Sequence, residues 1–213
     1  MDAFGIPSLT ELQQYNVNRP DQIEAIKASL YDFQPYAAAG QTQLSFFQTP
    51  KGGASGKTLA DTNMTAAGSL PAPISFLVQS IEIYFFPLNG ISATGAVVAS
   101  NWNDVYTIAK SGWLELFIGS KPYLDEAPLI KFPPRCGIAG VGALSDTTTA
   151  AAARVSKIDY ASFGGEPYDL KPPILLVPTQ NFEVTMNWPA LVPITVAGRI
   201  GVQLGGILYR NSQ

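Results

Sequence analysis

Histidine is missing from this chain, and cysteine occurs only once among its 213 residues. Without histidine there is no Ser-His-Asp triad, no histidine general base and no histidine-ligated metal. The lone thiol, Cys136, has no partner for an internal disulfide, and zinc clusters built on several thiolates are excluded as well. We therefore expect a protein that is not an enzyme and that binds no metal and no cofactor.

Charged side chains are also scarce. Asp, Glu, Lys and Arg make up 14% of the residues, compared with about 25% in an ordinary soluble domain. The net charge is −3 and there is no basic patch, so nucleic acid is not expected as a partner. A surface poor in charge and rich in small polar residues resembles the surfaces that are buried in protein assemblies. The alternative interpretation is a β protein with uncharged polar loops.

Long apolar runs are absent too. No stretch approaches the roughly 20 residues that are needed to cross a bilayer, and the longest, over residues 70–77, is broken by Pro71 and Pro73. The first seven residues lack the basic region and apolar core of a signal peptide. We expect a soluble protein that is made in a host cytoplasm and has no membrane partner.

Residues 52–58, Gly-Gly-Ala-Ser-Gly-Lys-Thr, end like a phosphate-binding P-loop. The full pattern needs a glycine five residues before Gly56, and that position is Lys51. A P-loop also needs a strand leading in and a helix leading out. Here Pro50 interrupts the approach and residues 58–63 are a poor helix. The sequence therefore predicts a glycine-rich surface loop.

The chemistry that remains is a hydrolase with a pair of carboxylates, a serine–lysine hydrolase or an oxygen-ligated calcium site. Asp125 and Glu126 are adjacent and would point opposite ways on a strand, while Glu166 and Asp169 are expected in a loop. A glycosidase needs two carboxyls roughly 5–10 Å apart across a sugar, which the spacing in sequence does not establish. Residues 61–63, Asp-Thr-Asn, resemble the start of a calcium loop, but the later glycine and glutamate are missing. We assign no catalytic, cofactor-binding or metal residue.

Aromatic side chains support one alternative function, a sugar-stacking platform in a lectin-like β-sandwich. Trp113 and Trp188 fall on expected strands, where the usual role is packing in the core or on the sheet surface. The full set of candidates is Trp102, Trp113, Trp188, Tyr106, Tyr123 and Tyr160.

Residues 1–40 differ from the rest of the chain and predict an N-terminal arm with short helices. Residues 8–11 and 21–24 both resemble capping boxes. Ile23, Ile26 and Leu30 would share one helical face, and Pro35 would end that second helix. The arm either packs on the domain or reaches a neighbouring subunit.

Strands dominate residues 41–213, which we interpret as one β domain. Residues 181–188 alternate without a fault between polar and apolar side chains, as a half-buried strand does. The other expected strands lie at 43–47, 73–88, 113–118, 129–132, 174–177, 191–197 (an edge strand, because of Pro193) and 200–209. Residues 100–110 predict a helix. Long loops are expected at 49–69 and 134–172.

In the last expected strand, the alternation of apolar side chains changes phase. Ile200, Val202 and Leu204 share one face, whereas Ile207 and Tyr209 fall on the other. One inserted residue at Gly205-Gly206 would return them to the inward face. We therefore predict a β-bulge there.

Three segments carry a resemblance to a known class of protein: residues 44–48 (Leu-Ser-Phe-Phe-Gln), 57–64 and 112–123. They resemble virion structural proteins of tailed bacteriophages, especially the cement or decoration proteins, and more broadly the viral jelly rolls. The resemblance implies an all-β fold, a jelly-roll β-sandwich of about eight strands in two sheets. It also implies a location in the virion, contact with the major capsid protein of the shell, and self-association as a dimer or trimer. The alternatives are a jelly-roll major capsid protein that forms the shell itself and a lectin-like glycan-binding protein.

Overall fold

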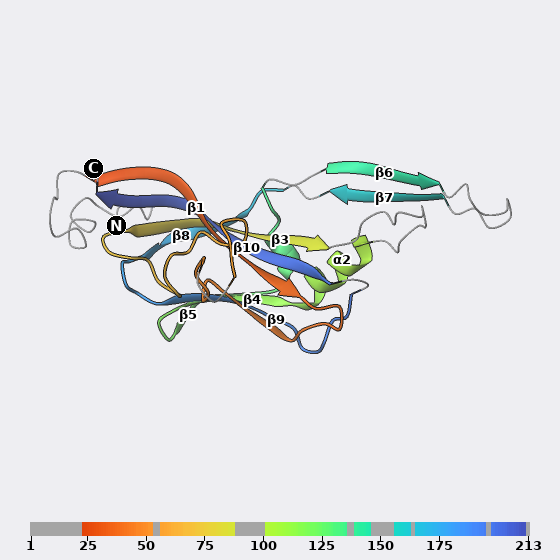
Figure 1. The fold of residues 1–213 in the computed structure, drawn as a ribbon, viewed down its shortest axis with the longest axis horizontal. Helices are drawn as coiled ribbons and strands as arrows, with labels where there is room; N and C mark the ends of the chain where they lie inside the picture. The colour runs from red at the N-terminus through yellow and green to blue at the C-terminus, as the bar shows by residue number, and fades with distance from the viewer. Residues whose placement is uncertain are drawn as a thin grey trace.

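The computed structural model describes residues 23–52, 56–87, 101–135, 139–145, 156–162, 165–194 and 197–211. Within these ranges the chain forms ten strands, one α-helix and one 3-10 helix (Figure 1). The all-β class expected from the sequence is confirmed.

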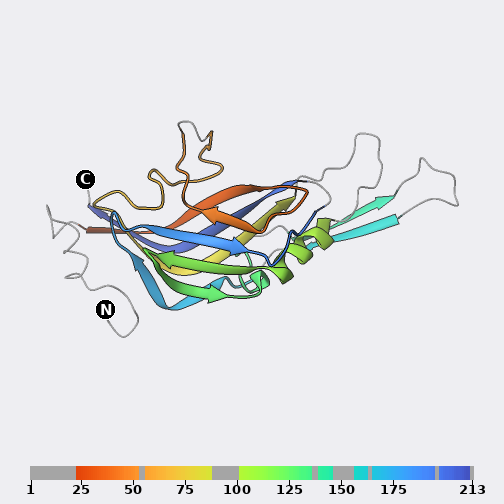
Figure 2. The same cartoon turned by 90° about the horizontal axis from the view of Figure 1, so that it is seen from below.

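Eight of the strands form two four-stranded antiparallel sheets, which lie one above the other in Figure 1. Sheet A has the order β1 (Ile23–Tyr36), β10 (Gly198–Asn211), β3 (Ser75–Pro87) and β8 (Tyr168–Leu176). Sheet B has the order β2 (Gln43–Phe46), β9 (Phe182–Asn187), β4 (Trp113–Ile118) and β5 (Lys121–Glu126). A separate hairpin, β6 (Ala139–Ser145) and β7 (Ser156–Ser162), lies beyond one end of them (Figure 2).

The strand pairs of the two sheets are nested along the chain. The first strand, β1, pairs with the last, β10; β2 pairs with β9, β3 with β8, and β4 with β5. Two further pairs, β10–β3 and β9–β4, complete the sheets. The chain therefore passes through β1 to β4 first and then through their pairing partners β5, β8, β9 and β10 in the reverse order.

Both sheets contribute to one hydrophobic core. Alternate residues of β9 (Phe182, Val184 and Met186) are fully buried and belong to the same cluster as Ile81 of β3 and Leu204 of β10. The predicted inward face of β4 is confirmed in the same way, because Leu114, Leu116 and Ile118 are all buried. Period-2 alternation placed these side chains correctly.

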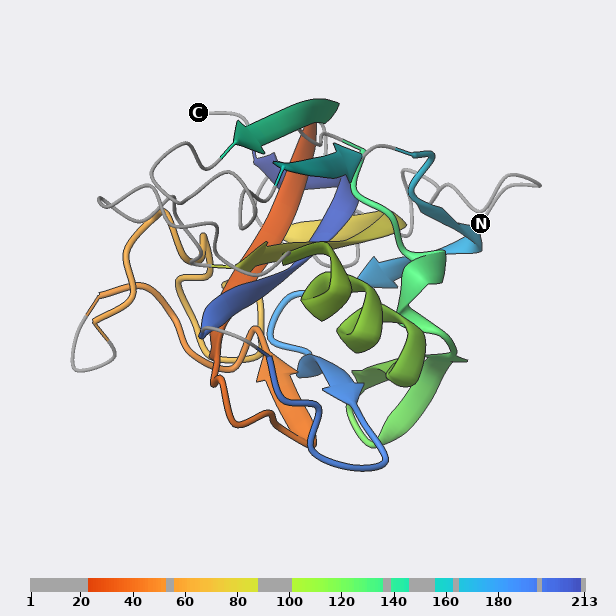
Figure 3. The same ribbon diagram turned by 90° about the vertical axis from the view of Figure 1, so that its right-hand side faces the viewer.

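Helix α2 (Asn101–Ser111) confirms the helix predicted over 100–110 and lies at the end of the sheets (Figure 3). Asp104 in its first turn and Lys110 in its last turn complement the helix dipole. The backbone carbonyl of Ile108 accepts a hydrogen bond from the indole nitrogen of Trp188 at 3.1 Å. Gly112 follows the helix, where a Cβ would lie 2.6 Å from that indole nitrogen, so a larger residue would displace Trp188.

The predicted second helix of the N-terminal arm is wrong. Residues Ile23–Tyr36 form strand β1, which pairs with β10 along its whole length. Leu30 and Asp32, both buried, face inward with period 2. The helical spacing of Ile23, Ile26 and Leu30 is thus overridden by long-range pairing, and these residues belong to sheet A. The other helix, expected near residues 8–11, lies outside the described residues.

Two expected strands are also wrong, and three strands were missed: β5, β6 and β7. The predicted long loop over 134–172 is therefore wrong in part, because β6, β7 and the start of β8, with Asp169, lie within it. Residues 129–132 contain the 3-10 helix η2 (Leu129–Lys131) instead of an edge strand. Residues 191–194 and 197 are not in a strand, while 195 and 196 lie outside the described residues. Strand β5 was not expected because it contains Pro122 and is mostly exposed, so it lacks an alternating pattern.

The predicted irregularity at Gly205-Gly206 is confirmed, but the extra residue lies on the partner strand. Gly205 pairs with Ser80 and Gly206 with Val78, which leaves Gln79 of β3 unmatched. Strand β10 keeps its register with β1 through the same residues. Ile207 and Tyr209 consequently stay on the outer face of sheet A, where Tyr209 and Leu77 form a second, smaller apolar cluster.

Candidate functional site

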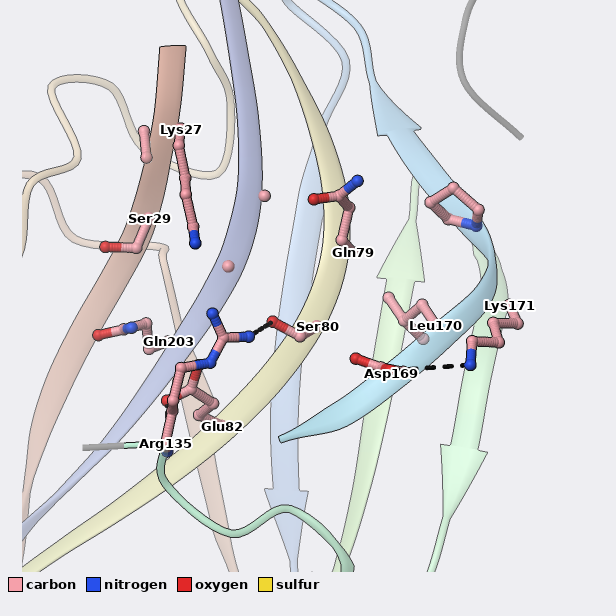
Figure 4. A pocket seen from close by; sticks show the side chains of 14 residues that line it. Lys27, Ser29, Gln79, Ser80, Glu82, Arg135, Asp169, Leu170, Lys171 and Gln203 are labelled. Atoms are coloured by element: carbon pink, nitrogen blue, oxygen red, sulfur yellow. Dashed lines mark hydrogen bonds and ion pairs between the residues drawn. The ribbon is translucent and has the colours of Figure 1, made fainter. Parts of the chain in front are cut away.

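The outer face of sheet A, turned away from the shared core, carries a groove of about 630 Å³ that we call the sheet A groove (Figure 4). All four strands of the sheet line it, together with the segment that follows η2. Its polar and charged side chains are those of Lys27, Ser29, Gln79, Ser80, Glu82, Arg135, Asp169, Lys171 and Gln203.

The local sequence explains why polar side chains gather there. The unmatched Gln79 shifts the phase of β3, so that Phe76 and Val78 face the core before it and Ile81 and Ile83 after it. Ser80 and Glu82 are thereby turned to the outer face. Gly205 of β10 has no side chain to fill the groove, and a Cβ there would lie 2.6 Å from the Ser80 hydroxyl.

Arg135 reaches the groove from the segment after η2. The Ile83 amide donates to the Phe132 carbonyl at 2.9 Å, which holds this segment against β3. The Arg135 amide donates to Glu82 Oε2 at 2.8 Å, and the Arg135 guanidinium donates to Ser80 Oγ at 3.4 Å.

Glu82 is a buried carboxylate, 1% exposed, at the floor of the groove. The Tyr84 hydroxyl donates to its Oε2 at 2.9 Å, and Arg135 Nε lies 3.8 Å from its Oε1. A buried carboxylate is costly unless it is paired and hydrogen-bonded. Here both conditions are met, so Glu82 and Arg135 balance each other's charge.

The remaining charges in the groove are two lysines and one aspartate. Lys171 Nζ lies 3.8 Å from Asp169 Oδ2, and both side chains are well exposed. Lys27 of β1 has no ion-pair partner within the described part of the chain. In Figure 4 its ammonium group points along the sheet toward the Arg135 guanidinium. The groove therefore has one positive charge in excess.

Next to the groove, on the same face, Arg199 lies over two phenylalanine rings. Its guanidinium carbon is 4.7 Å from the ring centre of Phe33 and 5.5 Å from that of Phe86, within the range of a cation–π interaction. Arg199 Nη1 also lies 3.3 Å from Asp61 Oδ1. The backbone amide and hydroxyl of Thr58 lower the pKa of Asp61, and Arg199 lowers it further.

Lys57 of the P-loop-like segment forms an ion pair with a buried carboxylate of β1. Its Nζ lies 2.7 Å from Oδ1 of Asp32, a β1 carboxylate that is 0% exposed. The Gly52 amide donates to the Lys57 carbonyl at 2.8 Å and closes the loop. This arrangement agrees with the prediction of a glycine-rich loop and ties that loop to sheet A.

The calcium-like segment 61–63 covers the edge of β1. The Phe33 amide donates to the Asp61 carbonyl at 2.8 Å. The Asn63 side chain accepts from the Tyr31 amide at 3.0 Å and donates to the Ser29 carbonyl at 2.7 Å. Covering an edge strand in this way prevents uncontrolled pairing with other chains. No metal-holding cluster of three acidic or thiol groups occurs among the described residues.

The candidate carboxylates fall in two separate parts of the fold, strand β5 of sheet B and the region at the start of β8 of sheet A. Asp125 and Glu126 are successive residues of β5. Glu126 lies 2.6 Å from Lys131 Nζ, and this hydrogen bond lowers the pKa of Glu126. Asp169 lines the sheet A groove, whereas Glu166 is exposed before β8.

The aromatic candidates do not form a platform around Trp188. This side chain is 3% exposed, and its ring meets that of Tyr36 edge-on at 5.6 Å in the core. Tyr106 and Tyr123 are exposed, but they lie on α2 and β5. The side chains of Trp102 and Tyr160, and all of Cys136, lie outside the described residues.

Sequence reasoning missed the groove because its charged residues come from separate strands. The one available signal was the alternation in β3, which placed Glu82 opposite Ile81 and Ile83. Comparison with protein-family models, with curated proteins and with solved structures gives no match. No helix in the described ranges is both long and apolar enough to span a bilayer.

Proposed function

We propose that this chain is a non-enzymatic virion structural protein, a jelly-roll β-sandwich that binds and stabilises a capsid as a cement or decoration protein. Its partners would be the major capsid protein of the shell and further copies of itself. Many copies that bind only the assembled shell stabilise that state by mass action.

The nested strand pairing carries this proposal. A jelly roll is a double sheet of eight strands built from two Greek keys, and viral capsid proteins commonly have it. The pairs β1–β10, β2–β9, β3–β8 and β4–β5, together with β10–β3 and β9–β4, support the proposal of that arrangement when β6 and β7 are treated as an insertion. A fold alone does not fix a function, so a second observation is needed.

The hairpin β6–β7 supplies one. It forms its own two-stranded sheet, hydrogen-bonded to neither larger sheet, and extends beyond α2 (Figure 1). An isolated two-stranded hairpin is at best marginally stable in water. Packing against a neighbouring subunit would stabilise it, and a surface with only 14% charged residues suits such contacts.

The same strand arrangement favours a second candidate, the subunit of the shell itself, because jelly rolls also build shells. The two roles differ in what the purified chain does alone. A shell subunit assembles into closed particles unaided, whereas a cement protein stays a small oligomer and binds shells that already exist.

Sedimentation velocity and negative-stain electron microscopy of the purified full chain test the proposal. A dimer or trimer supports the cement role, and closed particles support the shell role. A chain that stays monomeric from micromolar to millimolar concentration would contradict both, because assembly is the basis of each.

A further inference from the structure

We infer that the sheet A groove binds a monocarboxylate carried on a hydroxyl-rich group of sugar size, such as a uronic acid, with the Lys27 ammonium as its ion-pair partner. This inference does not depend on the virion role. It rests on the charge, the free donors and the size of the groove.

The net charge of the groove favours a ligand with a single negative charge. Glu82 is paired with Arg135, and Asp169 lies near Lys171, which leaves Lys27 as the excess cation. A carboxylate neutralises it. A phosphate dianion would bring a second negative charge close to the Glu82 and Asp169 carboxylates, where like charges repel.

The free donors suit a carboxylate next to hydroxyl groups. The Gln203 amide and the Ser29 hydroxyl, neighbours of Lys27 in the groove, have no side-chain hydrogen bond to any described residue. Figure 4 shows both on the same side of the groove as Lys27. An ammonium, an amide and a hydroxyl can share the oxygens of a carboxylate and of an adjacent sugar hydroxyl.

The size of the groove suits a sugar. Its volume of about 630 Å³ lies within the range of small-molecule sites, which is roughly 300–1,000 Å³. Leu170 and Pro173 of β8 add apolar surface on one side, where Asp169 and Lys171 are the polar groups, and Lys27 and Ser29 of β1 lie on the other side. Polar groups on both sides favour a ligand with several hydroxyls over a simple fatty acid.

Calorimetric titration of the full chain with glucuronate, glucose and inorganic phosphate tests the ligand class. We expect glucuronate to bind with a dissociation constant near the millimolar range, and glucose and phosphate to bind at least about tenfold more weakly. Binding of glucuronate should weaken as sodium chloride is raised, because salt screens an exposed ion pair.

The variant Lys27→Gln removes the excess charge but keeps a long polar side chain. It should weaken glucuronate binding at least about tenfold, the effect of losing a charge-assisted hydrogen bond. Lys121→Gln, an exposed lysine on β5 of the other sheet, is the matched control and should leave binding unchanged. Because Lys27 is exposed and forms no ion pair with any described residue, its variant should keep the wild-type circular dichroism.

Free glucuronate and a glycan that ends in glucuronate distinguish whether the ligand is a free acid or a terminal sugar residue. Retention of the protein on an immobilised glycan that ends in glucuronate would identify a terminal sugar residue. Binding of free glucuronate without such retention would identify a free acid. No glucuronate binding up to about 20 mM, equal binding of glucose or phosphate, or full binding by Lys27→Gln would each overturn the inference.

Discussion

Sheets A and B share one core, but their outer faces carry different chemistry. On sheet A the outer face holds a groove with a buried carboxylate, Glu82, and a cation, Lys27, that has no ion-pair partner among the described residues. On sheet B the outer face holds a compact polar network. There the Glu115 carboxylate accepts hydrogen bonds from Asn187 Nδ2 at 2.8 Å and from Thr185 Oγ1 at 3.1 Å.

The two sheets also differ in length. Strands β1 and β10 have 14 residues and β3 has 13, whereas the strands of sheet B have four to six. The longer strands give sheet A room for a second apolar cluster, a groove and an aromatic–arginine cluster in succession. The binding surface that we propose therefore lies on the sheet with the longer strands.

The largest expected effect compares two fully buried leucines. Leu116→Ala in the shared core should lower the free energy of unfolding by about 4 kcal/mol, and Leu77→Ala in the smaller outer cluster by about 2 kcal/mol. A small cluster collapses more easily around the lost side chain. Urea unfolding of both variants measures the difference, and a larger loss for Leu77→Ala would contradict this ranking.

A smaller effect is expected at the buried charge of sheet A. Asp32→Ala leaves the nearly buried Lys57 ammonium without its carboxylate and should cost about 3 kcal/mol. The control is Lys131→Ala, which breaks an exposed ion pair with Glu126 and should leave the unfolding midpoint nearly unchanged. Equal midpoints for the two variants would show that Asp32 is not the anchor of the glycine-rich loop.

The bulge offers a third comparison, between adjacent glycines. A Cβ at Gly206 would collide with the backbone carbonyl oxygen of Leu77, whereas at Gly205 it would meet the Ser80 hydroxyl, which can rotate. Gly206→Ala should therefore destabilise the chain by about 2 kcal/mol, and Gly205→Ala by less. Thermal unfolding followed by circular dichroism tests the order, and identical melting temperatures would disprove it.

The smallest effect concerns pH. The pKa of Asp61 is lowered in the folded chain by Thr58 and Arg199. Its contribution to stability is therefore present above the unfolded value of about 4 and is lost as the pH falls through the folded value. Compared with Asp61→Asn, the wild type should be more stable near pH 6 by less than about 1 kcal/mol. Near pH 2 the two should match. A constant difference from pH 6 to pH 2 would assign the effect to packing.

The sequence was informative where a pattern is local. Strands β4 and β9 were predictable because their side chains alternate, and α2 because Asp104 and Lys110 complement its dipole. Strand β1 was not, because its isoleucines also fit a helical face and only the distant β10 decides between the two. The bulge shows the same limit. The glycines marked its position, but the unmatched residue, Gln79, belongs to a strand far away in the sequence.

The candidate site was less predictable than the fold. Lys27, Glu82, Arg135 and Gln203 come from four separate parts of the chain, and none belongs to a recognisable motif. The motifs that did stand out have structural roles, since Lys57 anchors a loop and the segment 61–63 covers an edge. A groove on a sheet surface depends on strand order, which local patterns do not contain.

A crystal structure of the full chain with glucuronate tests the division between the two sheets most directly. We expect the sugar in the sheet A groove, with its carboxylate about 3 Å from Lys27 Nζ, and no sugar on the outer face of sheet B. A sugar bound on sheet B, or a carboxylate turned away from Lys27, would contradict the account.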